Sequence, residues 1–149
     1  MHWNVTAHPT APWVWRQIIA ATPWNTAPRF LIRDRDRNDG GDFVPKAAAL
    51  GIETNLTPVR APKANAIAER VIGTIRRDCL DHLIVLTERH LRRVLREYVA
   101  YYNDTRPHQS LGDQPPSGPR TPTLRSGAQR LASRPILGGL HHEYFWDAA

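Results

Sequence analysis

Two carboxylates, Asp34 and Glu69, are the residues of this sequence best placed to do chemistry. Asp34 follows the apolar run 29–33, which predicts a buried strand, and ligands tend to bind at the carboxyl ends of strands in an α/β sheet. Glu69 falls in the first turn of a predicted helix, after a proline-rich loop. Two such carboxylates can hold Mg²⁺, which takes oxygen ligands and shares phosphate oxygens of a substrate. A pair of these ions supports phosphoryl displacement.

A structural role for both carboxylates competes with this interpretation. Asp34 can cap a turn, and Glu69 favours a helix N-terminus because its charge complements the helix dipole. For an arbitrary Asp and Glu, residue type and spacing alone favour the structural role.

The elements that must position Asp34 and Glu69 follow from hydrophobic periodicity. A helix after Asn65 is predicted to bury Ile67, Val71, Ile75 and Cys79. Further helices are expected after Thr10, over 43–50 and from Thr87, and strands over 2–7, 29–33 and 52–56. Alternation of strand and helix predicts an α/β layered fold.

Composition bounds the class of protein. The 149 residues suffice for one domain with a modest core, and no apolar run approaches the roughly 18 residues of a membrane span. No secretory signal is apparent at the N-terminus. The single Cys79 forms no internal disulfide and suits a reducing cytoplasm. The net charge of +6 indicates either a polyanionic partner, nucleic acid ahead of membrane, or simply a basic soluble protein.

Five stretches together carry a resemblance to a known family. They are Phe30-Leu31-Ile32-Arg33-Asp34-Arg35-Asp36, residues 57–70 (TPVRAPKANAIAER), residues 73–81 (GTIRRDCLD), Tyr101-Tyr102-Asn103, and residues 106–111 (RPHQSL). In this order and spacing, over roughly residues 3–111, the sequence resembles the integrase core (DDE-type) domain of insertion-sequence transposases.

The resemblance implies a ribonuclease-H-like, retroviral-integrase-type fold with a site of Asp, Asp and Glu that holds two Mg²⁺ or Mn²⁺ ions. Asp34 matches the second aspartate and Glu69 the glutamate. Asp36 is the alternative second aspartate, but it lies one pleat further from the apolar strand. The implied reaction is metal-dependent nicking of DNA at the element's end, followed by attack of the freed 3′-hydroxyl on target DNA.

The sequence departs from the family before Asp34, because residues 1–33 contain no Asp or Glu to match the first aspartate. The predicted strand 2–7 matches the family's third strand. We therefore expect an N-terminally truncated core, with an unpaired edge on the strand 29–33, that is incomplete or inactive alone. The alternative function is that of a non-catalytic remnant that binds DNA or a transposase.

Basic side chains near Glu69 are the candidates for DNA contact, through phosphates rather than base edges. They are Arg60, Lys63, Arg70, Arg76 and Arg77, with Asn65 as either a helix cap or a phosphate contact. For four further arginines of the next predicted helix, Arg89, Arg92, Arg93 and Arg96, a solvated helix face is the favoured interpretation. His108 is expected to make a structural turn contact.

The chain is predicted to divide into a partial integrase catalytic core, residues 1–111, and a linker and tail, residues 112–149. Proline and glycine become frequent after Gly112, which predicts an extended Pro-rich C-terminal tail whose residues 138–146 could dock back onto the core. The expected partners are transposon-end and target DNA, and a full-length transposase or a second copy of the chain, with no membrane. The expected location is the cytoplasm, next to the nucleoid.

Overall fold

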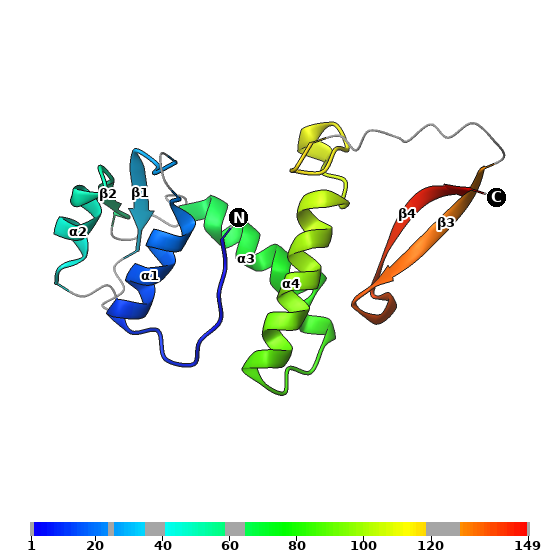
Figure 1. Cartoon of the computed structure of the whole chain (residues 1–149), viewed down its shortest axis with the longest axis horizontal. Coiled ribbons are helices and arrows are strands. Elements are labelled where there is room, and N and C mark those ends of the chain that lie inside the picture. Colours follow the sequence, from blue (N-terminus) through cyan, green and yellow to red (C-terminus); the bar gives the residue numbers. More distant parts are fainter. Residues whose placement is uncertain (1, 24–25, 35–40, 59–64, 119–128, 149) are drawn as a thin grey trace. The chain divides into compact units, whose positions relative to one another are not determined.

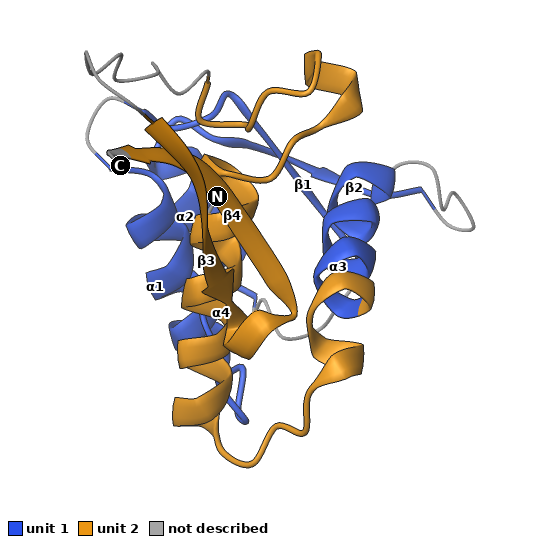
Figure 2. Ribbon diagram, turned by 90° about the vertical axis from the view of Figure 1, so that its right-hand side faces the viewer, with its two compact units in different colours: residues 1–76 blue, residues 77–149 orange. Residues whose placement is uncertain are grey.

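The computed structural model describes residues 2–23, 26–34, 41–58, 65–118 and 129–148, and its elements are mixed α and β (Figure 1). The chain divides into two compact units, residues 1–76 and 77–149, drawn in two colours in Figure 2. The predicted boundary at residue 111 concerns how far the catalytic core extends, and it stays a prediction. No helix in the described ranges is long and apolar enough to cross a membrane.

Unit 1 is built around a two-stranded parallel sheet. Its elements in chain order are α1 (Ala11–Ala21), β1 (Phe30–Arg33), α2 (Phe43–Ala49), β2 (Glu53–Leu56) and the greater part of α3 (Ala66–Asp78). Strand β1 pairs with β2 from Phe30 opposite Glu53 to Arg33 opposite Leu56. Helix α2 supplies the crossover that a parallel pair requires. The predicted strands at 29–33 and 52–56 and the helix at 43–50 are therefore confirmed to within one residue at each end.

The core of unit 1 consists of Phe43, Ala47 and Ile52, which are 4%, 0% and 2% exposed. Partly buried side chains pack against this cluster from α1 and β1, namely Val14, Trp15, Ile18 and Leu31. The two helices and the sheet are thus held by one small apolar cluster.

The predicted strand at residues 2–7 is wrong, because residues 2–10 form no regular element. Polar side chains of this segment bond to α1 instead. The His2 Nε2 atom lies 3.1 Å from Gln17 Oε1, and Asn4 Nδ2 donates to the same oxygen at 2.8 Å. Alternating apolar residues need a neighbouring strand to form a ladder, and here the nearest partner is a helix.

Unit 2 is organised by α4 (Glu88–Asp104), the longest helix. The helix predicted to start near Thr87 is confirmed, and the Thr87 side chain caps it by accepting a hydrogen bond from the His90 amide at 3.1 Å. The buried face of α4 carries Val94, Tyr98 and Val99. Two 3-10 turns flank the helix, η3 (Leu80–His82) and η4 (Gln109–Leu111).

The C-terminal residues form a β-hairpin, so the prediction of an extended tail is wrong for residues 129–148. Strand β3 (Gln129–Ile136) pairs antiparallel with β4 (His141–Ala148) across the turn η5 (Leu137–Gly139). Gly138 and Gly139 take positive φ angles of 67° and 101°, which glycine adopts without strain. Pro135 lies within β3, as a two-stranded sheet allows, since every strand is an edge.

Candidate functional site

Asp34 lies at the carboxyl end of the parallel sheet, as predicted. It follows β1 directly and its side chain is exposed. The pairing continues past the strand ends, where the Thr57 amide donates to the Arg33 carbonyl at 2.9 Å. Arg33 is itself fixed by the core, with its guanidinium 5.3 Å from the centre of the Phe43 ring. The backbone that carries Asp34 is therefore anchored on the buried cluster of unit 1.

Glu69 lies in the first turn of α3 and is exposed, which confirms its predicted place on a helix N-terminus. The predicted buried stripe of this helix holds only in part. Val71 and Ile75 are half-buried and Cys79 is fully buried, but Ile67 is 85% exposed. The apolar side of α3 is therefore covered towards its C-terminus, while the turn that carries Glu69 is open to solvent.

The described residues do not form a complete metal site. Asp34 and Glu69 offer the carboxylate oxygens that Mg²⁺ prefers. Within the described ranges, however, no group of three or more His, Cys, Asp or Glu side chains is arranged to hold an ion. Asp36, the alternative second aspartate, falls outside the described residues.

The basic residues predicted to contact DNA are exposed on α3 wherever the structure describes them. Arg70, Arg76 and Arg77 are all exposed. Residues seven apart lie on one face of a helix, so Arg76 lies on the face of Glu69 and Arg77 on that of Arg70. At about 1.5 Å per residue, this exposed basic strip extends about 10 Å along the helix from Glu69.

The structure says less about the other three residues predicted to contact DNA, Asn65, Arg60 and Lys63. Asn65 is half-buried in the turn just before α3. Arg60 and Lys63 fall outside the described residues, so their part in the basic strip stays a prediction.

An ion pair that sequence reasoning missed fixes the last residue of α3 in unit 2. The Asp78 carboxylate accepts from Arg106 at 2.8 Å and from the Tyr98 hydroxyl at 3.3 Å. Tyr98 is fully buried, and burial, followed by the charge of Asp78, raises the pKa of its hydroxyl. The signal for this pair was present in the sequence motifs, because Asp78 and Arg106 belong to two of the stretches that carry the family resemblance.

The histidines and the cysteine of unit 2 have structural surroundings. His108 Nε2 lies 3.3 Å from the Tyr102 carbonyl oxygen and its ring meets the Tyr102 ring edge-on, which confirms the predicted turn contact. His141 Nε2 lies 2.7 Å from the Asp78 carbonyl oxygen, and its ring stacks on Tyr101 with centroids 4.8 Å apart. Burial raises the pKa of the Cys79 thiol to about 11, with smaller contributions from nearby carboxylates, so the thiol is neutral at pH 7.

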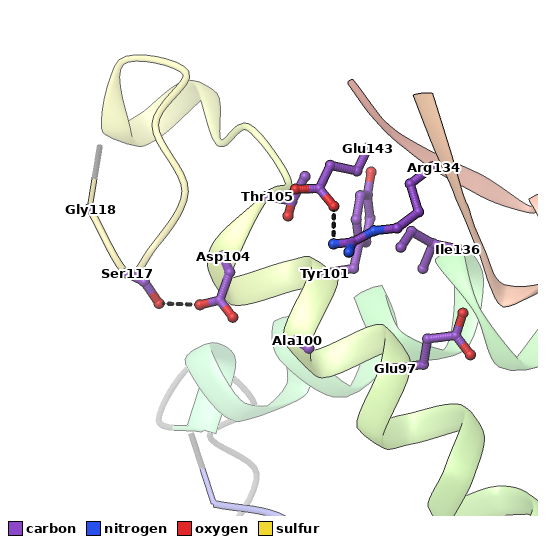
Figure 3. A pocket seen from close by; sticks show the side chains of 10 residues that line it. All are labelled: Glu97, Ala100, Tyr101, Asp104, Thr105, Ser117, Gly118, Arg134, Ile136 and Glu143. Carbon is purple, nitrogen blue, oxygen red and sulfur yellow. Dashed lines mark hydrogen bonds and ion pairs between the residues drawn. The ribbon is translucent and has the colours of Figure 1, made fainter. Parts of the chain in front are cut away.

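A cavity of about 520 Å³ lies in unit 2 between α4 and the hairpin (Figure 3). Its acidic side chains bond to neighbouring groups. The buried Glu143 pairs with Arg134, Asp104 accepts from the Ser117 hydroxyl at 2.7 Å, and Glu97 accepts from the Leu137 amide at 2.5 Å. These carboxylates hold the hairpin and the loop after α4 in place.

Part of the chain matches a known domain family. Residues 50–116 match the integrase core domain family, and this range contains β2, Glu69, α3 and α4. The resemblance to the integrase core domain of insertion-sequence transposases is therefore confirmed over these residues. An integrase core implies a ribonuclease-H-like fold, and the parallel strands and helices of unit 1 are of the mixed α/β kind that such a fold contains.

Relatives of known name are transposases. The chain is 36% identical over 70 residues to the transposase InsD for insertion element IS2A/D/F/H/I/K of Escherichia coli, which covers 47% of this chain and 23% of that protein. The same identity and length relate it to the putative transposase InsD for insertion element IS2E of Escherichia coli strain K12, of which 32% is covered. The matched part of the chain thus spans about a quarter to a third of these relatives.

Proposed function

We propose that this chain acts in DNA transposition as part of the catalytic core of an insertion-sequence transposase with a ribonuclease-H-like fold. One observation carries the proposal: the integrase-core match includes the helix α3, which exposes Glu69 beside Arg70, Arg76 and Arg77. A carboxylate at the start of a helix with arginines further along the same exposed side suits a polyanion held next to a metal ligand. The chain would work in the cytoplasm, where nucleoid DNA is its partner.

In this function the arginines of α3 hold phosphates, and the carboxylates bind metal. Guanidinium groups stay charged at every physiological pH and bind two phosphate oxygens at once. Because phosphates carry no sequence information, such contacts are independent of base sequence. Asp34 and Glu69 are proposed as two of the ligands for Mg²⁺ or Mn²⁺, with two ions in a complete site. Transposon ends and target DNA are the proposed substrates, and a full-length transposase or a second copy is a further partner.

A second candidate function, a DNA- or transposase-binding protein without catalysis, is favoured by the count of carboxylates. The proposed ligands Asp34 and Glu69 are two of the three carboxylates of a complete family site, and within the described ranges no group of three or more His, Cys, Asp or Glu side chains is arranged to hold an ion. We propose that this chain by itself binds DNA but does not cut it.

Replacing the three arginines of α3 is expected to lower the affinity for DNA and to make that affinity less sensitive to salt. The test measures fluorescence anisotropy of a short labelled duplex with the whole chain, between about 50 and 200 mM salt. The slope to compare is that of the logarithm of the binding constant against the logarithm of the salt concentration. For the variant Arg70→Gln, Arg76→Gln and Arg77→Gln this slope should be shallower by about 2–3, because each lost phosphate contact lowers its magnitude by about 0.9.

The control for this experiment removes the same charge elsewhere. The variant Arg16→Gln, Lys46→Gln and Arg130→Gln alters three exposed cations in other elements. It should change the salt slope much less than the α3 variant. Equal slopes for wild type and the α3 variant would refute the proposed contact surface.

A further inference from the structure

Helix α4 carries four arginines on a single stripe, which we call the arginine stripe: Arg89, Arg92, Arg93 and Arg96. Their spacing of three and four residues places them side by side on one face of the helix. Buried Val94 and Tyr98 lie on the opposite side, packed inside unit 2. The stripe therefore faces away from the core of unit 2.

The positive charge of the arginine stripe is largely uncompensated. Arg92 pairs with Glu88 at 3.4 Å. In the described part of the chain, Arg89, Arg93 and Arg96 have no carboxylate oxygen within 4.0 Å, and all three are exposed. Glu97 follows Arg93 by four residues and could pair with it, but the structure shows no such ion pair. One oxygen of Glu97 instead accepts a hydrogen bond from the Leu137 amide at the turn of the hairpin.

Such a stripe is unfavourable for an isolated helix, because like charges three and four residues apart repel. A solvated helix face normally mixes both signs, and the predicted role as a mere solvated face does not account for three unpaired guanidinium groups in a row. A polyanion removes the repulsion. The planar guanidinium of each of these arginines can bind phosphate oxygens in a two-pronged geometry.

We propose that the arginine stripe is a second DNA-contact surface, separate from the α3 strip, that binds backbone phosphates of duplex DNA. The proposal rests on the proposed function, since α4 lies within the integrase-core match. From Arg89 to Arg96 the stripe is about 10 Å long, which spans about three phosphates of one strand. An anionic membrane fits less well, because the apolar face of α4 is buried in the fold and cannot enter a lipid layer.

The test compares the variant Arg89→Gln, Arg93→Gln and Arg96→Gln with wild type in the same duplex-binding titration. We expect the log–log salt slope to become shallower by about 2.7 and the affinity at low salt to fall by roughly a hundredfold. The variant should melt at the same or a higher temperature than wild type, because repulsion along α4 is relieved. Should it not fold, the three single variants, each expected to lower the slope by about 0.9, decide the matter.

Several outcomes separate this proposal from the proposed function. A shallower slope for the α3 variant with no change for the α4 variant would overturn the second surface alone. A change for the α4 variant alone would support the stripe and refute the α3 surface. Absence of salt-dependent DNA binding by wild type would overturn both. If the α4 variant lost binding to phosphatidylserine-containing vesicles but kept its DNA slope, the stripe would be a membrane contact and the proposal would be wrong.

Discussion

Replacing Tyr98 with alanine is expected to lower the free energy of unfolding of unit 2 by about 3–5 kcal/mol. Tyr98 is fully buried, and its ring lies 5.9 to 6.3 Å from the rings of Tyr101, Tyr102 and His141. The alanine variant leaves a cavity among these rings and deprives Asp78 of a hydrogen bond. Since domains are stable by only about 5–15 kcal/mol, this loss would remove a large share of the stability of unit 2.

Urea denaturation followed by circular dichroism at the helix band would measure this loss, because α4 is the longest helix. Tyr98→Phe is the matched control, since it keeps the ring and removes only the hydroxyl that donates to Asp78. Asp78 retains Arg106 in that variant, so the cost should be only about 0.5–1.5 kcal/mol. Equal losses for the two variants would show that the hydroxyl, rather than ring packing, stabilises this core.

Replacing Phe43 with alanine should destabilise unit 1 by a similar amount, about 3–5 kcal/mol. Phe43 is 4% exposed and meets the Trp15 ring edge-on, with centroids 6.0 Å apart. The guanidinium of Arg33, the last residue of β1, lies over the Phe43 ring. Phe43→Ala therefore removes the ring that Arg33 packs on, next to Asp34, as well as apolar contact area.

Trp15 makes this prediction measurable by tryptophan fluorescence, provided that the other four tryptophans of the chain are replaced by phenylalanine so that the signal comes from the ring next to Phe43. The midpoint of urea unfolding should fall for Phe43→Ala, while Phe43→Leu, which keeps most of the apolar volume, should lose clearly less. A loss below about 1 kcal/mol for the alanine variant would mean that the cluster relaxes around the gap, and that it does not hold β1 in place.

Local signals in the sequence predicted most elements near Asp34 and Glu69. The helix that starts near Thr87, the apolar run before Asp34 and the helix that begins near Asn65 all depend on residues within a few positions of one another. For the same reason Asp34 could be placed at a strand end and Glu69 in a first helical turn. Each of these features is decided by short-range chemistry, which a single sequence contains.

The errors concern features decided by distant partners. Residues 2–7 alternate like a strand but find Gln17 of α1 rather than a neighbouring strand. Ile67 has helical core spacing, yet nothing in the sequence says that this turn of α3 stays open. The hairpin 129–148 was hidden by a proline-rich composition, and the carboxylate of Asp78 acquires its role only from Tyr98 and Arg106, 20 and 28 residues later.

The candidate site shows the same division between local and distant information. Composition and spacing alone favoured structural roles for Asp34 and Glu69, and the family resemblance singled them out for chemistry. The roles of Arg60, Lys63, Arg70, Arg76 and Arg77 in binding DNA stay predictions. The predicted solvated face of α4 agrees with the exposure of Arg89, Arg93 and Arg96, but a sequence does not show which carboxylates lie near each guanidinium.

We propose that this chain binds DNA, and that Asp34 and Glu69 alone do not complete the metal site needed to cut it. The most direct measurement is nicking of supercoiled plasmid by the purified chain in Mn²⁺, beside its Glu69→Gln variant. The account predicts no nicking by either protein, with salt-sensitive plasmid binding by both. Nicking by wild type that disappears in Glu69→Gln would contradict this proposal, because a working metal site that uses Glu69 would then exist in this chain.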